Sequence, residues 1–163
     1  MSGHRFRLVL EKEDFKFAAA HFTLLGGGQA EPLHGHNYRV RVEIAGSTLD
    51  EDGLLVELAP FKAAIRAACA SLDDRILLPE RSPRLSVRES AGSISVSYED
   101  RAYRFPASEV LRLPLINSSI ELLAELLWRR LAPALVGSPA RFLSVGVEEA
   151  AGQLAIFESA LPD

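Results

Sequence analysis

Two histidines near the start of one strand-like run are spaced to share a metal ion. His34 and His36 precede an alternating segment, residues 38–44, whose apolar residues interleave with Arg39, Arg41 and Glu43. A period of two predicts a strand with one buried face, and both histidines share the parity of its apolar residues. In an extended chain their Cα atoms lie roughly 6.5–7 Å apart, so both imidazoles can reach one ion.

His21 is the predicted third ligand. It ends a second apolar segment, residues 15–21, whose alternate apolar residues share its parity, whereas His4 lies near the start of the chain. Three neutral imidazoles with an open fourth position are typical of catalytic zinc sites, so we predict that Zn²⁺ binds His21, His34 and His36. A His-Gly-His triplet alone is more often a polar turn that enters a strand, but the third histidine of matching parity favours the metal site.

Further strands are predicted on both sides of these histidines. Their period-two patterns cover residues 5–11, 85–88, 93–98, 102–105, 141–148 and 154–158. The first strand is expected to pair with the next one along the chain. The middle three predict a small meander, and the last two predict a closing hairpin.

Two segments have a helical period instead. Apolar residues recur on one helical face over residues 57–71 and again over residues 122–135. Cys69 lies on the first apolar face, which favours a small buried side chain over a nucleophile. Ser118 and Glu121 predict a capping box at the second helix. Strands, helix, strands, helix and strands in this order predict an α+β fold, with two helices on one face of an antiparallel sheet.

The composition predicts one domain over residues 1–163. The chain is 48% hydrophobic and 25% charged, which is sufficient for a sizeable core. Its net charge of −4 provides no electrostatic footprint for nucleic acid or an anionic membrane, so neither partner is expected. The single cysteine excludes an intrachain disulfide, and the amino end resembles neither a signal peptide nor a membrane span. We therefore expect a cytoplasmic protein.

Six short blocks of sequence carry a family resemblance. They are Phe17-x-Ala19-Ala20-His21, Leu33-His34-Gly35-His36-Asn37-Tyr38, Gly53-Leu54-Leu55-Val56-Glu57, Leu72-Asp73-Asp74-Arg75-x-Leu77, Asn117-Ser118-Ser119-x-Glu121-x-x-Ala124 and Val145-x-Val147-x-Glu149. In this order, across nearly the whole chain, they resemble the 6-pyruvoyltetrahydropterin synthase and 6-carboxytetrahydropterin synthase family.

The resemblance implies a particular fold and assembly. The expected architecture is the tunnelling fold, in which three subunits close their sheets into a barrel and two trimers stack. A homo-trimer or hexamer is therefore expected. Closure between subunits is one way to protect open sheet edges, and a monomer with covered edges is the alternative.

The resemblance also implies an activity. These enzymes are zinc-dependent lyases that act on 7,8-dihydroneopterin triphosphate. The side-chain hydroxyls of the substrate bind the metal, the adjacent C–H becomes acidic, and triphosphate is lost. The resemblance allows three products, with a pyruvoyl, a carboxy or a hydroxymethyl group at position 6 of the pterin. It likewise allows three pathways, those of tetrahydrobiopterin, queuosine (a deazapurine) and folate.

The usual catalytic groups of the family are replaced in this chain. Members of the family abstract the proton with a cysteine, and this chain has Ala30 at that position. It also has Asp73-Asp74 where the family has an Asp-His pair. Some relatives without the cysteine carry a glutamate at the neighbouring place, so the resemblance implies that Glu31 is the general base. Partial burial would raise the pKa of Glu31 towards a useful range, whereas a nearby zinc ion would oppose that rise. Asp73 and Asp74 are the candidate proton shuttle.

Two plainer alternatives concern Glu31 and the protein as a whole. Glu31 follows the loop Gly26-Gly27-Gly28, which we expect to be mobile over the metal. Because Glu31 also precedes Pro32 on a loop, an ordinary solvated charge is the alternative to a general base. Without the usual cysteine and histidine, the protein is alternatively a catalytically lapsed module that binds zinc and pterin.

Glu149, Ser118 and Ser119 are the predicted pterin contacts. The resemblance places Glu149 on the pterin-anchoring strand, where a carboxylate accepts two N–H bonds from an aminopyrimidinone ring. A solvent-facing strand charge is the alternative. Ser118 and Ser119 occupy the Pro-Thr positions of the family motif, although helix capping alone would also explain them.

Overall fold

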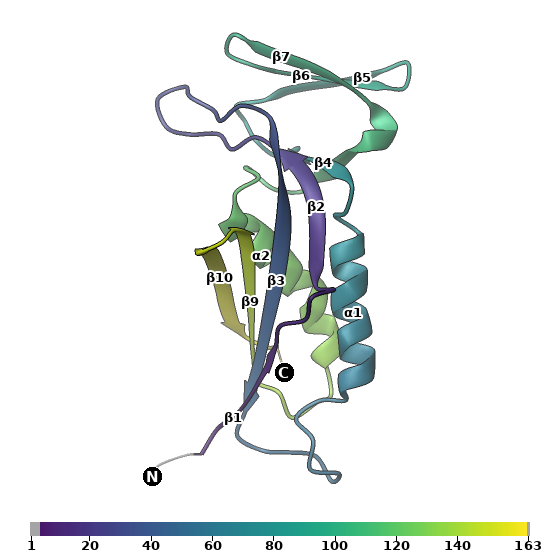
Figure 1. Ribbon diagram of the computed structural model, residues 1–163, viewed down its shortest axis with the longest axis vertical. Coiled ribbons are helices and arrows are strands. Elements are labelled where there is room, and N and C mark those ends of the chain that lie inside the picture. The colour runs from purple at the N-terminus through teal and green to yellow at the C-terminus, as the bar shows by residue number, and fades with distance from the viewer. Residues whose placement is uncertain (1–3, 163) are drawn as a thin grey trace.

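The structure, a computed structural model, describes residues 4–162 and is built on one large curved sheet (Figure 1). The strands of this sheet are β1 Phe6–Leu10, β2 Lys16–His21, β3 His34–Gly46, β4 Arg75–Pro79, β8 Val110–Leu113, β9 Phe142–Ala150 and β10 Gln153–Ala160. Their order is β10-β9-β3-β2-β4-β8, and β1 also pairs with β3. The 13-residue strand β3 therefore links the two halves of the sheet.

Strands β1 and β2 follow one another along the same edge of β3. β2 pairs antiparallel with residues 34–39 of β3, and β1 pairs with residues 42–46. Between them the chain turns at residues 12–15 and then returns to the edge, where the N–H of Val40 donates to the Phe15 carbonyl at 2.8 Å. The prediction that the opening strand pairs with the next one is therefore wrong, because this irregularity breaks one edge into two strands.

Strands β4 and β8 join the sheet in parallel. Ala19 is in register with Arg75, and Ile76 is in register with Val110. The antiparallel prediction holds for the strands from β10 to β2 and fails for these two. Residues 76–79 form a continuous apolar run, the pattern of a strand buried on both faces, so no period-two signal marked them.

Two helices cover one face of the large sheet (Figure 1). Helix α1, Leu58–Ala70, buries Phe61, Ile65 and Cys69, and helix α2, Ile120–Leu131, packs on β9 and β10. Trp128 on α2 donates from Nε1 to the Leu143 carbonyl of β9 at 2.8 Å. The 3₁₀ turn Ala132–Leu135 continues α2. This arrangement confirms the α+β fold with two helices on one face.

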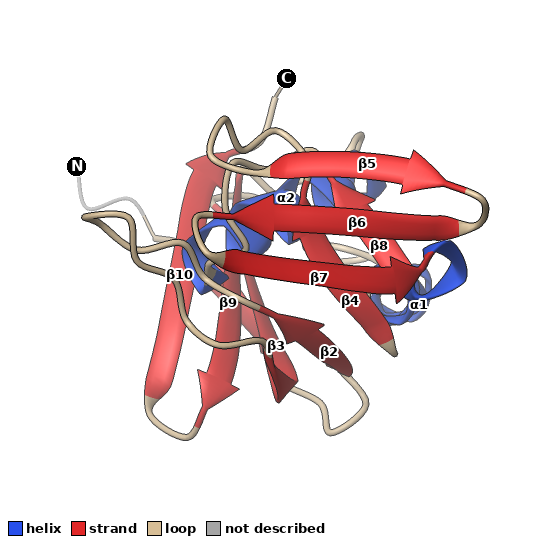
Figure 2. Ribbon diagram, turned by 90° about the horizontal axis from the view of Figure 1, so that it is seen from above, coloured by secondary structure: helices blue, strands red, loops and turns tan. Residues whose placement is uncertain are grey.

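The predicted meander forms a separate three-stranded sheet across one end of the molecule (Figure 2). Its strands are β5 Ser86–Ser90, β6 Ser93–Tyr98 and β7 Arg101–Pro106; a 3₁₀ turn, Ala107–Glu109, leads from β7 to β8. Ile94 and Val96 share a hydrophobic cluster with Phe22 and Leu24, which follow β2. The small sheet therefore covers the loop that connects β2 to β3.

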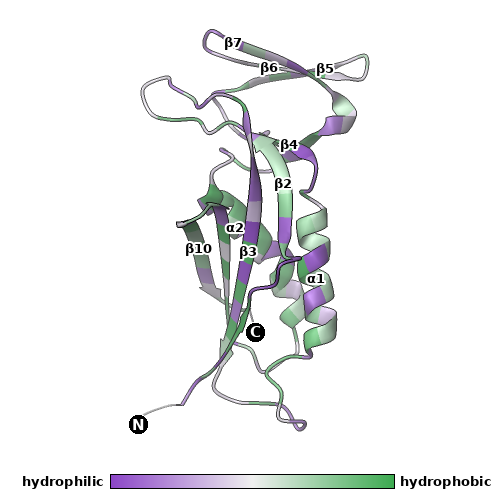
Figure 3. Cartoon of the chain, in the orientation of Figure 1, coloured by the Kyte–Doolittle hydropathy of each residue, from purple (hydrophilic) through white to green (hydrophobic). Residues whose placement is uncertain are grey.

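The hydropathy of β3 changes along its length. Its upper part is hydrophilic and its lower end is hydrophobic (Figure 3). The upper part carries His34 and His36 at the same end of the sheet as His21, whereas the lower end is buried in the core. Within residues 4–162, no helix has both the length and the apolar character needed to cross a membrane.

Candidate metal centre

The three predicted histidines converge at one end of β2 and β3. His21 is directly opposite His34 in the strand register, and Ala19 is opposite His36. Because alternate residues of a strand share a face, all three imidazoles lie on the same side of the sheet as Tyr38. One ring nitrogen from each histidine lies within 4.8 Å of the others. Small side-chain rotations would bring all three nitrogens onto a single ion.

Two main-chain carbonyls orient two of these rings. His21 Nδ1 lies 2.8 Å from the Ser118 carbonyl oxygen, and His34 Nδ1 lies 2.6 Å from the Pro32 carbonyl oxygen. A carbonyl oxygen only accepts, so in both rings Nδ1 carries the hydrogen and Nε2 keeps its lone pair. An outer hydrogen bond of this kind is the usual support of a metal-binding histidine.

The donor set fits a zinc ion. His21 Nε2 is buried and has no hydrogen-bond partner, and burial lowers the pKa of His21, so its ring stays neutral. His34 Nε2 and His36 Nε2 lie 2.9 Å apart. A buried polar atom without a partner is costly, and a metal ion would satisfy the lone pair of His21. Three neutral imidazole nitrogens are ligands that zinc accepts.

Glu149 lies beside this cluster. It shares the parity of Val145 and Val147 on β9, so its half-buried side chain is on the core side of the sheet. One carboxylate oxygen is 3.9 Å from His36 Nε2, and the other accepts a hydrogen bond from Gln153 at 2.6 Å. Glu149 is therefore not a charge on the outer face of the strand. Gln153, which holds its carboxylate, lies across the hairpin and was not predicted.

Glu31 approaches the histidines from the loop between β2 and β3. Its pKa is lowered, chiefly by a hydrogen bond from the Thr23 hydroxyl and further by the neighbouring His34 and His21, whereas its partial burial acts in the opposite direction. The expected rise in the pKa of Glu31 is therefore wrong. The carboxylate is ionised at neutral pH and is held by Thr23, a residue outside every motif of the sequence.

The glycine loop that leads to Glu31 is held by two arginines, Arg101 in the small sheet and Arg84 just before it. Gly27 and Gly28 have φ values of +66° and +75°, which non-glycine residues rarely adopt. Arg84 donates to the Leu25 carbonyl at 2.6 Å, and Arg101 donates to the Glu31 carbonyl at 2.7 Å. Neither arginine stood in a recognisable motif, because their partners lie 59 and 70 residues away in the sequence.

Ser118 supports His21. Its side chain is fully buried and donates to the Phe22 carbonyl at 2.9 Å, while its own carbonyl accepts from His21. The capping-box prediction is wrong, because the N-cap residue of α2 is Ser119 and no side chain caps the helix. Asn117 also holds the chain after β2. Its side-chain oxygen accepts from the N–H of Leu24, and its side-chain nitrogen donates to the Leu24 carbonyl.

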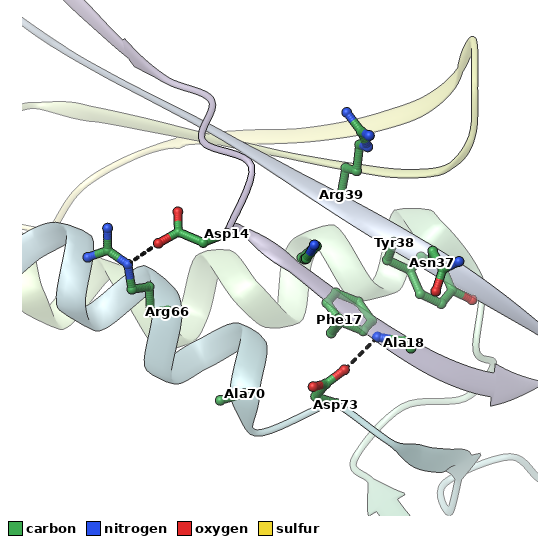
Figure 4. A pocket seen from close by; sticks show the side chains of 10 residues that line it. Asp14, Phe17, Ala18, Asn37, Tyr38, Arg39, Arg66, Ala70 and Asp73 are labelled. Carbon is green, nitrogen blue, oxygen red and sulfur yellow. Dashed lines mark hydrogen bonds and ion pairs between the residues drawn. The ribbon is translucent and has the colours of Figure 1, made fainter.

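Asp73 and Asp74 lie between α1 and β4, next to Ala18 of β2. Asp73 lines a hollow of about 600 Å³ together with Ala18, Asn37 and Tyr38 (Figure 4). Asp73 Oδ1 accepts the N–H of Ala18 at 2.7 Å, and the N–H of Asp74 donates to the Ala18 carbonyl at 2.7 Å. Neither aspartate belongs to the group of three imidazoles that could hold one ion. None of the three histidines lines the hollow in Figure 4, although Tyr38, whose ring neighbours those of His21 and His36, does line it.

Comparisons with known proteins agree with this architecture. The chain is 24% identical over 149 residues to a putative 6-carboxy-5,6,7,8-tetrahydropterin synthase of Methanocaldococcus jannaschii, covering 90% of this chain and 91% of the relative. The crystal structure of 6-pyruvoyl tetrahydropterin synthase from Plasmodium vivax superposes with a TM-score of 0.90 at 28% identity, covering 96% of this chain and 99% of the other.

Two variants of the P. vivax enzyme have also been solved, each with a TM-score of 0.87 and 28% identity to this chain. In these variants a catalytic glutamate is replaced by alanine or by cysteine, and this chain is covered to 96% and the variants to 99%. The sequence model of the 6-pyruvoyl tetrahydropterin synthase family matches residues 10–160, which is most of the chain. The fold is thus the tunnelling fold of these enzymes, and the protein belongs to the 6-pyruvoyl tetrahydropterin synthase family.

Proposed function

We propose that this protein is a zinc-dependent lyase that acts on 7,8-dihydroneopterin triphosphate or a similar 6-substituted dihydropterin. The observation that carries the proposal is the grouping of three imidazoles with the carboxylates of Glu31 and Glu149. This set combines a metal site, a base and an anchor for a ring with N–H donors. Membership of a pterin synthase family supports the choice of substrate class.

Each residue has a proposed task. His21, His34 and His36 hold the zinc ion, which when bound would polarise the side-chain oxygens of the substrate and acidify the neighbouring C–H. Glu149 accepts N–H bonds from the pterin ring, which fixes its orientation. Ser119, half-buried at the start of α2, is the remaining candidate for a polar contact with the ring.

Glu31 is the proposed base. Its lowered pKa keeps it ionised, so it is ready to accept a proton, although an acid with a low pKa is a weaker base. Ionisation matters because only the carboxylate form can accept a proton from the substrate. A related enzyme from P. vivax has a catalytic glutamate, which supports a carboxylate in this role. Asp73 and Asp74 are left out of the chemistry proposed for a single chain.

Triphosphate release tests the activity. The zinc-loaded protein is incubated with 7,8-dihydroneopterin triphosphate, and release is compared between the unchanged protein, Glu31→Gln and Glu51→Gln, an exposed glutamate in the turn after β3. Loss of a general base typically lowers the rate by a factor on the order of 10²–10⁴, so Glu31→Gln should show that loss and Glu51→Gln should show none. A rate that survives Glu31→Gln within about threefold contradicts the role of Glu31.

The second candidate function is a lapsed module that binds zinc and pterin without turnover. Two observations favour it: Ala30 stands at the position of the family cysteine, and Asp74 stands where the family has the histidine of its Asp-His pair. The same incubation separates the two functions. Tight pterin binding without triphosphate release by the unchanged protein would identify the lapsed module.

We also propose a homo-oligomer, either a trimer or a hexamer. Large apolar side chains stay exposed on the sheet face opposite the helices, including Phe142, Leu154 and Ile156, and the outer edge of β10 has no pairing strand among residues 4–162. Closure against further copies would cover both features. Light scattering should give a mass of three or six chains, and Ile156→Glu should lower that mass.

A further inference from the structure

Two buried polar atoms are left without partners in this fold. Over residues 4–162, the buried side-chain nitrogens and oxygens that make no hydrogen bond are His21 Nε2 and the Tyr38 hydroxyl. Native proteins contain few such atoms, and each one calls for a physical explanation. The proposed zinc ion accounts for His21 and leaves the Tyr38 hydroxyl unexplained.

Tyr38 belongs to the wall of the candidate metal centre. Its ring centroid lies 5.6 Å from that of His36 and 5.9 Å from that of His21. The ring stacks on Phe17 with centroids 4.7 Å apart and an interplanar angle of 16°, which fixes its direction. Its hydroxyl points along β2 towards the end of the strand that carries His21 (Figure 4). Burial, and after it the charges of Glu149 and Glu31, raise the pKa of this hydroxyl.

Packing alone does not require the hydroxyl. The fully buried aromatic positions around the core are otherwise occupied by phenylalanine, at Phe15, Phe17, Phe22 and Phe61. A phenylalanine at position 38 would make the same stack on Phe17 without burying a polar atom. A tyrosine in this place is therefore costly to the empty protein, unless a ligand provides the missing partner.

We propose that the Tyr38 hydroxyl binds an oxygen atom of the hydroxylated side chain of the pterin, and so positions that side chain between the histidines, Glu31 and Glu149. This inference rests on the proposed function and adds a positioning residue to it. A phenol is neutral at neutral pH and offers one donor and an acceptor, which suits a hydroxyl group of the ligand. Glu149 would hold the ring of the ligand, and Tyr38 would hold its side chain.

The test pairs a hydroxyl on the protein with a hydroxyl on the ligand. Zinc-loaded protein is titrated with 7,8-dihydroneopterin and with 6-methyl-7,8-dihydropterin, which lacks the side-chain hydroxyls. Tyr38→Phe should weaken binding of the first ligand about tenfold and of the second less than twofold, because only the first loses a hydrogen bond. Tyr103→Phe, which removes a hydroxyl from the small sheet, is the matched control and should change neither affinity.

Stability of the zinc-free protein provides a second readout. Tyr38→Phe should unfold at the same temperature as the unchanged protein or higher, because the removed hydroxyl has no partner. Tyr98→Phe should unfold at a lower temperature, because the Tyr98 hydroxyl contacts Arg84 and the Gln29 carbonyl. This opposite sign would support an unpartnered Tyr38 hydroxyl.

Two results would overturn the inference. If Tyr38→Phe weakens the binding of both ligands equally, or destabilises the zinc-free protein as Tyr98→Phe does, the hydroxyl has a structural role. If the unchanged protein binds neither ligand, the proposed function itself fails and the role of Tyr38 fails with it. The two failures differ because the second appears without any substitution. Zinc content is measured in every variant, and Tyr38→Phe should retain one ion per chain.

Discussion

Arg101 Nη1 donates a 2.7 Å hydrogen bond to the main-chain carbonyl of Glu31, 70 residues earlier in the chain. The small three-stranded sheet is thereby connected to the residue proposed as the base. Arg84, next to the same sheet, binds the Leu25 carbonyl of the same loop. A small sheet without a motif of its own thus restrains the loop that carries Glu31.

Replacing Arg101 should reduce turnover more than binding. Arg101→Ala leaves Glu149 and the histidines intact, so pterin affinity and zinc content should stay unchanged while kcat falls about tenfold through a less restrained Glu31. Arg101→Lys keeps a donor and should recover part of the loss. Arg104→Ala, an exposed arginine on the same strand, is the control. Equal losses in Arg101→Ala and Arg104→Ala would contradict a specific clamp.

Removing one histidine should remove the metal. His34→Ala and His36→Ala should each lower zinc content from one ion per chain to a small fraction, because a site with an open position cannot spare one of three protein ligands. Metal analysis after dialysis measures this. His4→Ala changes an exposed histidine outside the site and should keep the full zinc content. Undiminished zinc in His34→Ala would refute the ligand assignment.

Pterin affinity should depend on Glu149 and not on its neighbour. Glu149→Ala should weaken pterin binding about 10- to 100-fold, since hydrogen bonds to a charged group contribute about 1.5–3 kcal/mol, and zinc should remain. Glu148→Ala is the adjacent control, because the Glu148 carboxylate accepts from Gly152 in the hairpin turn. Fluorescence titration compares the variants, and equal affinities would mean that Glu149 is not the anchor.

Asp73 should contribute to stability. Its carboxylate binds the N–H of Ala18, so Asp73→Ala should lower the free energy of unfolding by about 1 kcal/mol, while Asp73→Asn keeps an oxygen acceptor and should lose less. Urea unfolding measures both. If Asp73→Asn instead keeps full stability and loses most of the triphosphate-releasing activity, the aspartate is part of the chemistry.

Cys69 should be unreactive in the folded protein. Burial in the core, followed by the nearby charges of Asp73 and Asp14, raises the pKa of its thiol to about 12. At pH 8 the thiolate is therefore scarce, and the side chain is also 2% exposed. A thiol reagent should react very slowly with the folded protein and with one group per chain in denaturant. Fast reaction in the folded state would contradict this burial.

Local patterns in the sequence were sufficient for the histidine cluster. His34 and His36 share the parity of one strand, and His21 shares the parity of another, so a simple antiparallel pairing brings all three together. The same alternation along Val145, Val147 and Glu149 determines that the carboxylate lies on the core side. Period-two and helical patterns likewise indicated both helices, the meander and the closing hairpin, because each pattern depends only on near neighbours.

The tertiary structure decided which distant groups surround these residues. The Ser118 carbonyl that orients His21 is 97 residues away, and no local pattern links the two. The lowered pKa of Glu31 depends on Thr23 across the loop, and the position of Asp73 depends on how β4 enters the sheet. The role of Ser118 was also decided by the tertiary structure, because its hydroxyl donates to the Phe22 carbonyl and does not cap the helix. Strand parity is a local property, whereas hydrogen-bond partners are selected only when the whole chain packs.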